Sequence, residues 1–582
     1  MRRCWRRSSA RVALAASLVA LAASCGDARR APPLESAILI TLDTTRADAL
    51  SCYGGPAGAT PHIAALARES RVYDQARTVV PLTLPAHASM LTGATPLRHR
   101  VRDNSLDALP QSADTIAERA RERGLSTAAF VSAVVLDRAF GTDQGFDTYD
   151  QPPRTLAQTT SHAGERSAAD TIAAAQAWLA ARDRTRGFLL WIHLFDAHAP
   201  YAPPADCLAQ AGGDAYLGEI AAQDRALGAL LDGLRADGTL ARTLVVLTAD
   251  HGESLGEHGE ATHGAYCYDA TLRVPLLVRD PASAGRGDRD AAPVGVIDVG
   301  PTIAEALDLR ALDADGVSLF RRAAPPSRRL YFESYYGYLS YGWSPLAGCF
   351  DERAKYIHSS QPELYDLASD PRELRDVHAE RATDVPRYVD AIAAAAARPA
   401  FARAESDRVD AAMLERLRAV GYTGGGAIAH ALPGPLDASA LPSPRARADE
   451  LARTLDALGL SDAGRHAEAV EPLRAIAAAN PRNYVALERL GNALVLLGRH
   501  AEAVAPLEAL CANGPQWAGA HYNLGVALYQ SGRQDAGLDH FRRAVALDPG
   551  HVQALDALAK VLEARGARAE AAEFRAALER VR

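Results

Sequence analysis

Three runs of consecutive apolar residues, each followed directly by an aspartate, constrain the fold of this chain most strongly. The runs cover residues 37–42, 188–195 and 244–249, and the aspartates are Asp43, Asp196 and Asp250. Strands that are apolar on both faces are typical of a largely parallel sheet with helices on either side. We therefore predict an α/β fold, with the amphipathic stretches 112–123 and 167–182 among the covering helices.

The positions of the three aspartates predict a functional site. In open α/β sheets, ligands bind beyond the carboxyl ends of the strands. Three separate strands that each end in a carboxylate are therefore expected to build one site from Asp43, Asp196 and Asp250. Any one of these aspartates could instead cap the helix that follows it.

Length and charge narrow the functional classes. With 582 residues, the chain is too long for one ordinary core, so at least two domains are expected. Its 48% hydrophobic and 23% charged residues are typical of a globular protein. The net charge of −8, with no basic block beyond the extreme N-terminus, argues against nucleic acid as a partner.

The N-terminus has the pattern of an export signal over residues 1–24. Five arginines precede a short apolar stretch, and small residues lead to Cys25. This arrangement resembles a bacterial lipoprotein signal, which would make Cys25 a lipid-anchored first residue, and we favour it over simple secretion. The apolar stretch is too short for a membrane span. We expect a protein of the periplasm or cell envelope that contacts the membrane through a lipid anchor alone.

The remaining five cysteines show no Cys-x-x-Cys spacing, which argues against a thiolate zinc site.

The composition changes near residue 425, and residues 426–446 are predicted to be a linker rich in Gly, Ala, Pro and Ser. Residues 447–582 then repeat with a period of 34, seen in Gly464, Gly498, Gly532 and Gly566. That period indicates tetratricopeptide repeats, which stack into a solenoid and bind protein partners.

The densest chemical signal is the loop from Asp250 to Gly259, with His263 close behind it. Adjacent Asp250 and His251 at a strand end can both bind one divalent cation, and the neighbouring glycines allow close approach of the backbone. A buried Asp–His pair can also be a purely structural hydrogen bond. The density of Gly and His in this loop favours the metal site.

Several motifs in a fixed order over roughly residues 36–380 resemble the sulfatase family of the alkaline phosphatase superfamily, and we predict a sulfatase-like catalytic domain over residues 36–425. The segments are Leu42–Asp48 (LDTTRAD), Thr83–His87 (TLPAH), Leu91–Gly93 (LTG), Asp196–Tyr201 (DAHAPY), Asp250–Gly259 (DHGESLGEHG), Arg273–Pro275 (RVP) and Glu363–Pro371 (ELYDLASDP). The resemblance implies a sulfatase-like domain.

One motif departs from the family pattern. Sulfatases have a Cys or Ser that matures to formylglycine at the position of Thr83, and an Arg at the position of His87. Threonine is not a substrate for that maturation, so no formylglycine is expected. The pattern Thr-x-Pro-x-His instead resembles the nucleotide pyrophosphatase/phosphodiesterase branch, in which a threonine hydroxyl attacks phosphorus. The resemblance also extends to Asn104, where relatives place an Asn that contacts a non-bridging ester oxygen.

The resemblance implies roles for the individual residues. Asp43, Asp250 and His251 would hold one divalent cation next to the nucleophile Thr83. Charge on the transferring oxygens would be stabilised by donors such as Asn104 and His198. Either His198 or His263 could protonate the leaving group.

The metal is predicted from the same ligand set. Thr44 occupies a position where many sulfatases have a further Asp, so we favour Zn²⁺ or Mn²⁺, with Ca²⁺ still open. One ion is expected because Pro200 stands where two-metal relatives have a His. Asp196, His258 and His263 leave a second ion open, and His87 is a further candidate residue of the site.

We therefore predict a metal-dependent, sulfatase-like hydrolase of sulfate or phosphate esters, with phosphodiester or phosphonate chemistry favoured. Its substrate would be a small or a glycan- or lipid-linked ester. Two alternatives stay open: a transferase that moves a phospho-headgroup, and an inactive enzyme fold that presents its repeats to partners. We also expect truncation near residue 440 to leave small-ester turnover intact.

Overall fold

The computed structural model describes residues 34–105, 107–152, 166–282, 287–320, 328–404, 409, 413, 432–513 and 517–581. The predicted signal sequence, Cys25 and residues 426–431 of the predicted linker lie outside these ranges, so the structure does not bear on them.

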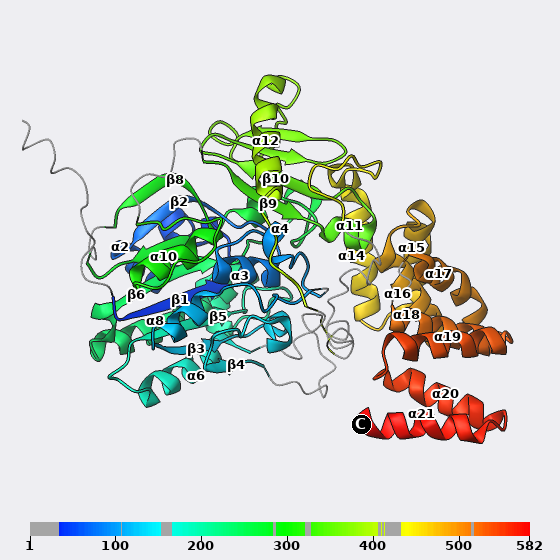
Figure 1. Cartoon of the computed structure of the whole chain (residues 1–582). Helices are drawn as coiled ribbons and strands as arrows, with labels where there is room; N and C mark the ends of the chain where they lie inside the picture. The colour runs from blue at the N-terminus through cyan, green and yellow to red at the C-terminus, as the bar shows by residue number, and fades with distance from the viewer. Residues whose placement is uncertain are drawn as a thin grey trace, which may run out of the picture.

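The larger sheet is the centre of the molecule, and its strand order is β4-β3-β5-β1-β6-β7-β2-β8 (Figure 1). β7 runs antiparallel to both of its neighbours, while the other pairs are parallel. The strands are β1 (Ser36–Leu42), β2 (Arg71–Arg77), β3 (Ser126–Phe130), β4 (Thr148–Asp150), β5 (Phe188–Leu194), β6 (Thr243–Ala249), β7 (Leu276–Arg279) and β8 (Arg289–Gly295).

Two groups of helices pack against this sheet. One group contains α2 (Pro61–Arg68), α6 (Ala168–Ala181) and α8 (Ala215–Ala236), and the other contains α3 (Thr83–Thr92), α5 (Ile116–Glu122) and α10 (Val299–Ala306). Shorter helices are α4 (Pro96–His99), α7 (Ala205–Gln210) and α9 (Asp269–Leu272). All residues of β1, β5 and β6 are buried, as expected for strands covered on both faces.

The three apolar runs form β1, β5 and β6, and β1 lies between the other two. The predicted α/β fold is confirmed. Because β5, β1 and β6 are parallel, their carboxyl ends lie at one edge of the sheet, which brings segments more than 200 residues apart in the sequence together.

A second, antiparallel sheet follows in the chain. Its strands are β9 (Leu330–Ser334), β10 (Leu346–Phe350), β11 (Ala354–His358) and β12 (Glu363–Asp366), in the order β12-β11-β10-β9. The short helix α11 (Tyr336–Tyr341) lies between β9 and β10 in the chain, and α12 (Val385–Ala396) packs on β9 and β10. The apolar residues of α12 and of this sheet form a core of their own.

The C-terminal part is entirely helical in its described residues. The helices are α14 (Ala448–Asp462), α15 (His466–Ala479), α16 (Tyr484–Leu496), α17 (His500–Asn513), α18 (Ala518–Gln530), α19 (Gln534–Leu547), α20 (Val552–Ala564) and α21 (Arg568–Val581). Each helix contacts the next one along the chain, which gives a stack of helix pairs (yellow to red in Figure 1). Within the described residues, no helix has the length and apolar character needed to cross a bilayer.

The four periodic glycines lie at equivalent positions, each between the two helices of a pair. All four have a positive φ between 72° and 92°, which glycine adopts without the steric cost that other residues meet. Gly491 and Gly525 have a different role. A Cβ on Gly491 would lie 2.4 Å from the Leu507 side chain, and one on Gly525 would lie 2.6 Å from Phe541. The missing side chains therefore allow neighbouring helices to approach closely.

The helical part packs directly on the sulfatase-like part. Leu451 of α14 and Val485 of α16 belong to the same buried apolar cluster as the strands of the large sheet. A Cβ on Gly259, in the loop after β6, would lie 2.8 Å from the Cβ of Ala448. The Asn480 side-chain amide also donates a hydrogen bond to the carbonyl oxygen of Tyr341. The first helices of the repeat region therefore form part of the wall behind the loop that follows β6.

Candidate functional site

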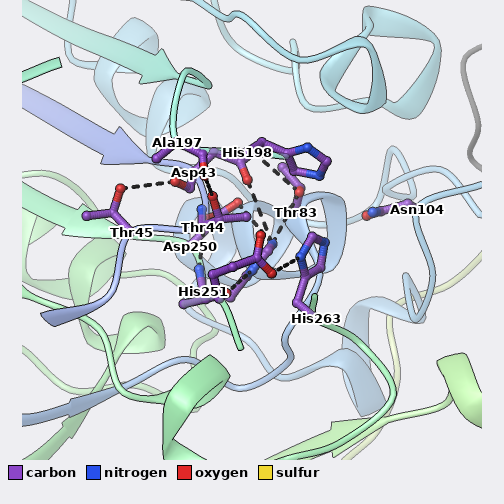
Figure 2. Close-up of polar contacts among 12 residues, drawn as sticks. Asp43, Thr44, Thr45, Thr83, Asn104, Ala197, His198, Asp250, His251 and His263 are labelled. Carbon is purple, nitrogen blue, oxygen red and sulfur yellow. Dashed lines mark hydrogen bonds and ion pairs between the residues drawn. The ribbon is translucent and has the colours of Figure 1, made fainter. Parts of the chain in front are cut away.

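Asp43, Asp250 and His251 meet at the carboxyl ends of β1 and β6 (Figure 2). One ligand atom from each residue lies within 4.8 Å of the others, and all three side chains are fully buried. Nδ1 of His251 lies 2.9 Å from the carbonyl oxygen of Gly252, so its Nε2 atom is the one available to this cluster. Two carboxylate oxygens and an imidazole nitrogen are suitable ligands for a divalent cation.

The electrostatics of the two aspartates fit a cation. Asp43 Oδ1 and Asp250 Oδ2 are buried and have no hydrogen-bond donor among the described residues. Burial raises the pKa of Asp43 to about 7, and burial together with the neighbouring Asp43 carboxylate raises the pKa of Asp250. Two buried carboxylates this close are unfavourable unless a positive charge compensates them. The residues present therefore fit a bound divalent ion.

Thr83 is the first residue of α3, and its side chain is fully buried. Its Oγ1 atom lies 3.5 Å from Asp43 Oδ2 and 3.4 Å from His251 Nε2. The predicted nucleophile is therefore next to the predicted ligands. The position at the N-terminus of a helix also favours negative charge on an attacking oxygen or on a bound ester.

Thr44 and His87 lie beside the site but are engaged elsewhere. The Thr44 hydroxyl donates a hydrogen bond to the carbonyl oxygen of Ala197 at 2.6 Å. This bond connects the segment after β1 to the segment after β5. Thr44 also has a φ of 47°, and its N–H donates to Asp250 Oδ1 at 3.3 Å. His87 lies one turn into α3, where its Nδ1 contacts the carbonyl oxygen of Thr83 at 2.8 Å. Both side chains therefore hold neighbouring backbone in place beside the site.

Asn104 holds the start of α3. Its Oδ1 accepts the backbone N–H of Leu84 at 2.9 Å, which satisfies one of the free donors of the first helical turn. The carbonyl end of the side-chain amide is thereby fixed, and its NH₂ group is the part left to contact a substrate. Figure 2 shows Asn104 set off from the acidic cluster, on the far side of Thr83.

His198 and His263 border the cluster. The ring of His263 lies 4.4 Å from that of His251 and 5.2 Å from that of His198, measured between centroids. Nδ1 of His198 lies 2.7 Å from the carbonyl oxygen of Ala199. Burial lowers the pKa of His198 to about 3 and that of His263 to about 4.

The structure adds a residue that the sequence reasoning missed. Glu253 is fully buried, and its Oε1 lies 2.9 Å from Nδ1 of His263. Its Oε2 accepts the hydroxyl of Tyr201 at 3.3 Å. Burial raises the pKa of Glu253 to about 7. The signal that could have found Glu253 is its position three residues after Asp250, on the loop that also supplies His251.

A buried histidine on β5 was also missed. His193 Nε2 lies 3.3 Å from Asp43 Oδ2, and its ring packs against that of His87 at 4.8 Å between centroids. A histidine inside an apolar run is read as a core residue, and only strand pairing shows that this one is next to Asp43.

Two residues predicted as additional members of the site lie elsewhere. Both carboxylate oxygens of Asp196 accept the backbone N–H of Ala168 at 3.0 Å. Asp196 therefore caps the start of α6, a helix that precedes it in the chain, and not the helix that follows it. His258 stacks on Tyr268 at 3.7 Å between centroids, and its Nε2 contacts the carbonyl oxygen of Arg372. Neither side chain is available for a second metal ion next to the first.

Comparison with known proteins agrees with this geometry. Residues 36–309 match the family model described as Sulfatase. These residues are therefore similar to the sulfatase family and form a sulfatase-like domain. The predicted class of enzyme, a sulfatase-like ester hydrolase, is confirmed at the level of the family.

Curated relatives of the sulfatase domain act on different esters by name. Steryl-sulfatase of Mus musculus is 26% identical over 523 residues, covering 65% of this chain and 84% of the relative. Choline-sulfatase of Rhizobium meliloti is 30% identical over 175 residues, but these cover only 28% of this chain and 32% of the relative. Ulvan-active sulfatase of Formosa agariphila is 27% identical over 316 residues, covering 47% of this chain and 61% of the relative.

Solved structures share the fold. A structure described as a complex with its substrate D-glucosamine-2-N,6-O-disulfate has a TM-score of 0.53 at 20% identity, covering 62% of this chain and 96% of that one. Phosphonate monoester hydrolase of Agrobacterium radiobacter has a TM-score of 0.50 at 21% identity, covering 62% and 95%. At such identities the similarity establishes the fold.

The helical part has a separate match. Residues 482–548, which span α16 to α19, match the family model described as Bacterial transcriptional activator domain. This match supports a helical repeat region behind the sulfatase domain. The finer assignment to tetratricopeptide repeats stays a prediction.

Proposed function

We propose that this protein hydrolyses a sulfate or phosphate ester through a covalent ester on Thr83, with one divalent cation held by Asp43, Asp250 and His251. The observation that carries the proposal is the position of Thr83 Oγ1, 3.5 Å from Asp43 Oδ2 and 3.4 Å from His251 Nε2. A bound Zn²⁺ or Mn²⁺ would supply a Lewis acid that lowers the pKa of a nearby hydroxyl and neutralises developing charge.

The residues of the chain account for the remaining steps. The Thr83 hydroxyl gives its proton to solvent water as its oxygen attacks the central phosphorus or sulfur atom, and the bond to the leaving oxygen breaks as the new ester bond forms. A histidine at the rim gives a proton to the leaving oxygen. Water then attacks the same central atom and gives one proton to that histidine. The bond from the central atom to the Thr83 oxygen breaks, and this oxygen takes a proton back from solvent. The Asn104 amide is a donor for the equatorial oxygens.

Phosphodiester and phosphonate chemistry is favoured over sulfate ester chemistry. Thr83 replaces the Cys or Ser that sulfatases convert to an aldehyde, so a hydroxyl must attack directly. Relatives of both kinds are among the similar proteins, namely steryl-sulfatase and phosphonate monoester hydrolase.

A panel of 4-nitrophenyl esters tests the proposal. The purified protein is assayed with the phosphate monoester, a phosphodiester, a phosphonate monoester and the sulfate ester, each with Zn²⁺, Mn²⁺ and Ca²⁺. We expect the highest kcat/KM for a phosphodiester or phosphonate. Turnover of the sulfate ester alone, together with an aldehyde at position 83 in a peptide mass spectrum, would overturn the proposed nucleophile. A protein that forms a stable complex with a partner but turns over none of these esters would instead support the scaffold alternative.

We also propose that the protein is exported and anchored through Cys25, and that the helical stack recruits a protein partner. The basic, apolar and small-residue segments of the N-terminus support the first part, and the 34-residue period supports the second. Fractionation of cells that express Cys25→Ala tests the anchor. We expect this variant to leave the membrane fraction, in which the unmodified protein should be retained.

A further inference from the structure

We propose that the ring of Tyr336 forms the wall of the substrate site that contacts the organic part of the ester, and that the first repeats hold this ring in place. An aromatic ring binds another ring by offset stacking or by an edge-to-face contact, so the proposed substrate class is an aryl ester. The inference deepens the function proposed above and rests on it. It gives the repeat region a part in the choice of substrate.

Tyr336, the first residue of α11, is partly exposed and lies at the edge of the site. A Cβ added to Gly264 would lie 3.3 Å from Cγ of Tyr336 and 3.2 Å from Cδ2 of Leu82, so the ring and the leucine meet at this glycine. Leu82 directly precedes Thr83, and Gly264 directly follows His263. The Tyr336 ring therefore packs against the segments that carry the proposed nucleophile and one of the two histidines beside it.

A third segment of the site also approaches this ring. Burial raises the pKa of Tyr336, and the nearby carboxylate of Asp103 raises it further. Asp103 directly precedes Asn104, whose Oδ1 holds the start of α3. An ester with its central atom at Thr83 Oγ1 would therefore extend its organic group along the exposed part of the Tyr336 ring.

The helices of the first repeats hold α11 in this position. α11 contacts α16 directly (Figure 1). The side-chain amide of Asn480, between α15 and α16, donates to the carbonyl oxygen of Tyr341 at 2.9 Å and to Glu450 Oε1 at 2.6 Å. A Cβ on Gly342 would lie 2.4 Å from Cβ of Arg482. The end of α11 is therefore packed tightly against the connection between α15 and α16.

Contacts within and around α11 connect this end to Tyr336. The rings of Tyr336 and Tyr341 pack edge to face, with their centroids 5.7 Å apart. The N–H of Tyr336 donates to the hydroxyl oxygen of Ser334 at 3.2 Å, and this hydroxyl donates to the carbonyl oxygen of Gly264. Release of α11 from Asn480 would therefore move the Tyr341 ring, and with it the ring of Tyr336. Asn480 is in this way a positioning residue, and Tyr336 is the residue that touches the substrate.

Two phosphonic acids test the proposal without turnover. Phenylphosphonate and methylphosphonate share the charged group and differ in the organic part, and neither contains an ester bond. Isothermal titration calorimetry gives the Kd of both for the Zn²⁺-loaded wild type, Tyr336→Ala, Tyr336→Phe and Asn480→Ala. We expect the wild type to bind phenylphosphonate roughly 10- to 100-fold more tightly than methylphosphonate, since burial of one aromatic ring supplies such a factor.

The variants should change this preference and not the binding of the charged group. Tyr336→Ala should lose the preference, and Tyr336→Phe should keep it because the ring is retained. Asn480→Ala should reduce it about threefold or more, since the ring is then no longer held in place. The Kd of methylphosphonate should stay within about twofold of the wild type in all of them, because its methyl group is too small to depend on the ring.

The matched control is Asn492→Ala, which removes another side-chain amide of the repeat region, one that bonds to Asn523 of α18 instead of α11. It should keep the wild-type preference, and Tm and zinc content are compared in all variants. A Tyr336→Ala variant with the wild-type preference, or a wild type that binds both phosphonates equally, would overturn the wall. A wild-type preference in a folded Asn480→Ala variant would overturn the role of the repeats. A Zn²⁺-loaded wild type that binds neither phosphonate would instead refute the proposed function.

The kinetic constants give a second readout. With the 4-nitrophenyl ester of the best class, we expect Tyr336→Ala to raise KM roughly 10-fold or more. The kcat value should stay within a few-fold of the wild type, because the ring contacts the organic part and not the reacting atoms. Asn480→Ala should change KM in the same direction. A fall in kcat at an unchanged KM would contradict a wall that binds the organic part of the ester.

Discussion

At the scale of single residues, Asp43 and Asp250 determine what this site can do. Both are fully buried, and each has an oxygen without a donor among the described residues. Placing two such carboxylates against each other costs free energy of folding, which a bound cation offsets. The proposed nucleophile, Thr83, is placed by backbone geometry, because it is the first residue of α3 and its Oγ1 lies 3.5 Å from Asp43 Oδ2.

Replacement of the proposed nucleophile should separate catalysis from metal binding. We expect Thr83→Ala to lower kcat on the best nitrophenyl ester by on the order of 10³-fold or more, since no other hydroxyl replaces it. Thr83→Ser should keep measurable turnover. Thr92→Ala, at the other end of α3, is the control and should stay within a few-fold of the wild type. Metal content measured by plasma mass spectrometry should not differ among them, and wild-type turnover by Thr83→Ala would refute the role of Thr83.

The raised pKa of Asp43 predicts how pH affects the metal-free protein. Its folded pKa of about 7 lies above its ordinary value near 3.8, so the folded state binds more protons than the unfolded state between these values. Stability of the chelated protein should therefore fall as pH rises from about 4 to about 7. The gain in Tm on adding Zn²⁺ or Mn²⁺ should be larger at pH 8 than at pH 5. In Asp43→Asn this pH dependence should flatten, and an unchanged slope would show that Asp43 is not its source.

The sequence predicted the residues of the metal-binding cluster, but it did not predict the buried residues that lie around them. Asp43, Thr83, Asp250 and His251 follow from their places after apolar runs or in short motifs. Glu253 was missed because a glutamate in a Gly-rich loop reads as a surface residue, and its burial depends on the chain packed around it. His258 was overvalued for the opposite reason, since only its stacking on Tyr268 shows that it faces away from the site.

At the scale of elements, the position at which a strand ends and the contacts of the helices decide which predictions from the sequence agree with the structure. β5 ends at Leu194, so Asp196 is one residue further from the sheet edge than Asp43 or Asp250 are from theirs. That difference is enough for its carboxylate to reach the start of α6 instead of the site. The apolar runs predicted β1, β5 and β6 well, whereas the antiparallel insertion of β7 depends on pairing that no local pattern encodes.

Helix packing in the repeat region gives a prediction with an internal control. A Cβ on Gly525 would lie 2.6 Å from Phe541, so Gly525→Ala should destabilise the stack by about 1–3 kcal/mol. Gly459, on an exposed face of α14, has nothing within 4 Å of an added Cβ. Gly459→Ala should therefore be neutral or stabilising by up to about 1 kcal/mol. Tm values from circular dichroism compare the two, and equal effects would contradict the close packing.

At the scale of the whole molecule, the repeat region shares part of its apolar core with the sulfatase-like domain. Leu451 and Val485 lie in the apolar cluster of the sulfatase domain, and Arg445 pairs with Asp376 at 2.8 Å. The sequence suggested a linker over residues 426–446 and a dispensable module after it. Composition alone could not show that residues 432–446 follow the surface of the second sheet, where Ser344 donates its N–H to the carbonyl oxygen of Pro442.

Truncation tests this arrangement. Contrary to the expectation from sequence, we expect a chain ending at residue 440 to have a lower Tm and reduced turnover, because removal of Leu451 and Val485 exposes the core. A chain ending at Asn513 keeps α14 to α17 and should retain the wild-type Tm of the sulfatase domain. If both truncated chains match the full chain in Tm and kcat/KM, the packing between the two parts does not contribute to stability or activity.

The contact between Gly259 and Ala448 has a consequence for attempts to exchange parts of this protein. Any side chain at position 259, or a side chain larger than alanine at position 448, would push apart the loop after β6 and the first repeat helix, since a Cβ added at position 259 already comes within 2.8 Å of Ala448. A graft of foreign repeats would therefore have to preserve a small residue at this seam. A deliberately bulky residue there offers a way to loosen the loop that carries Glu253 from a distance, without touching any group that meets the ester.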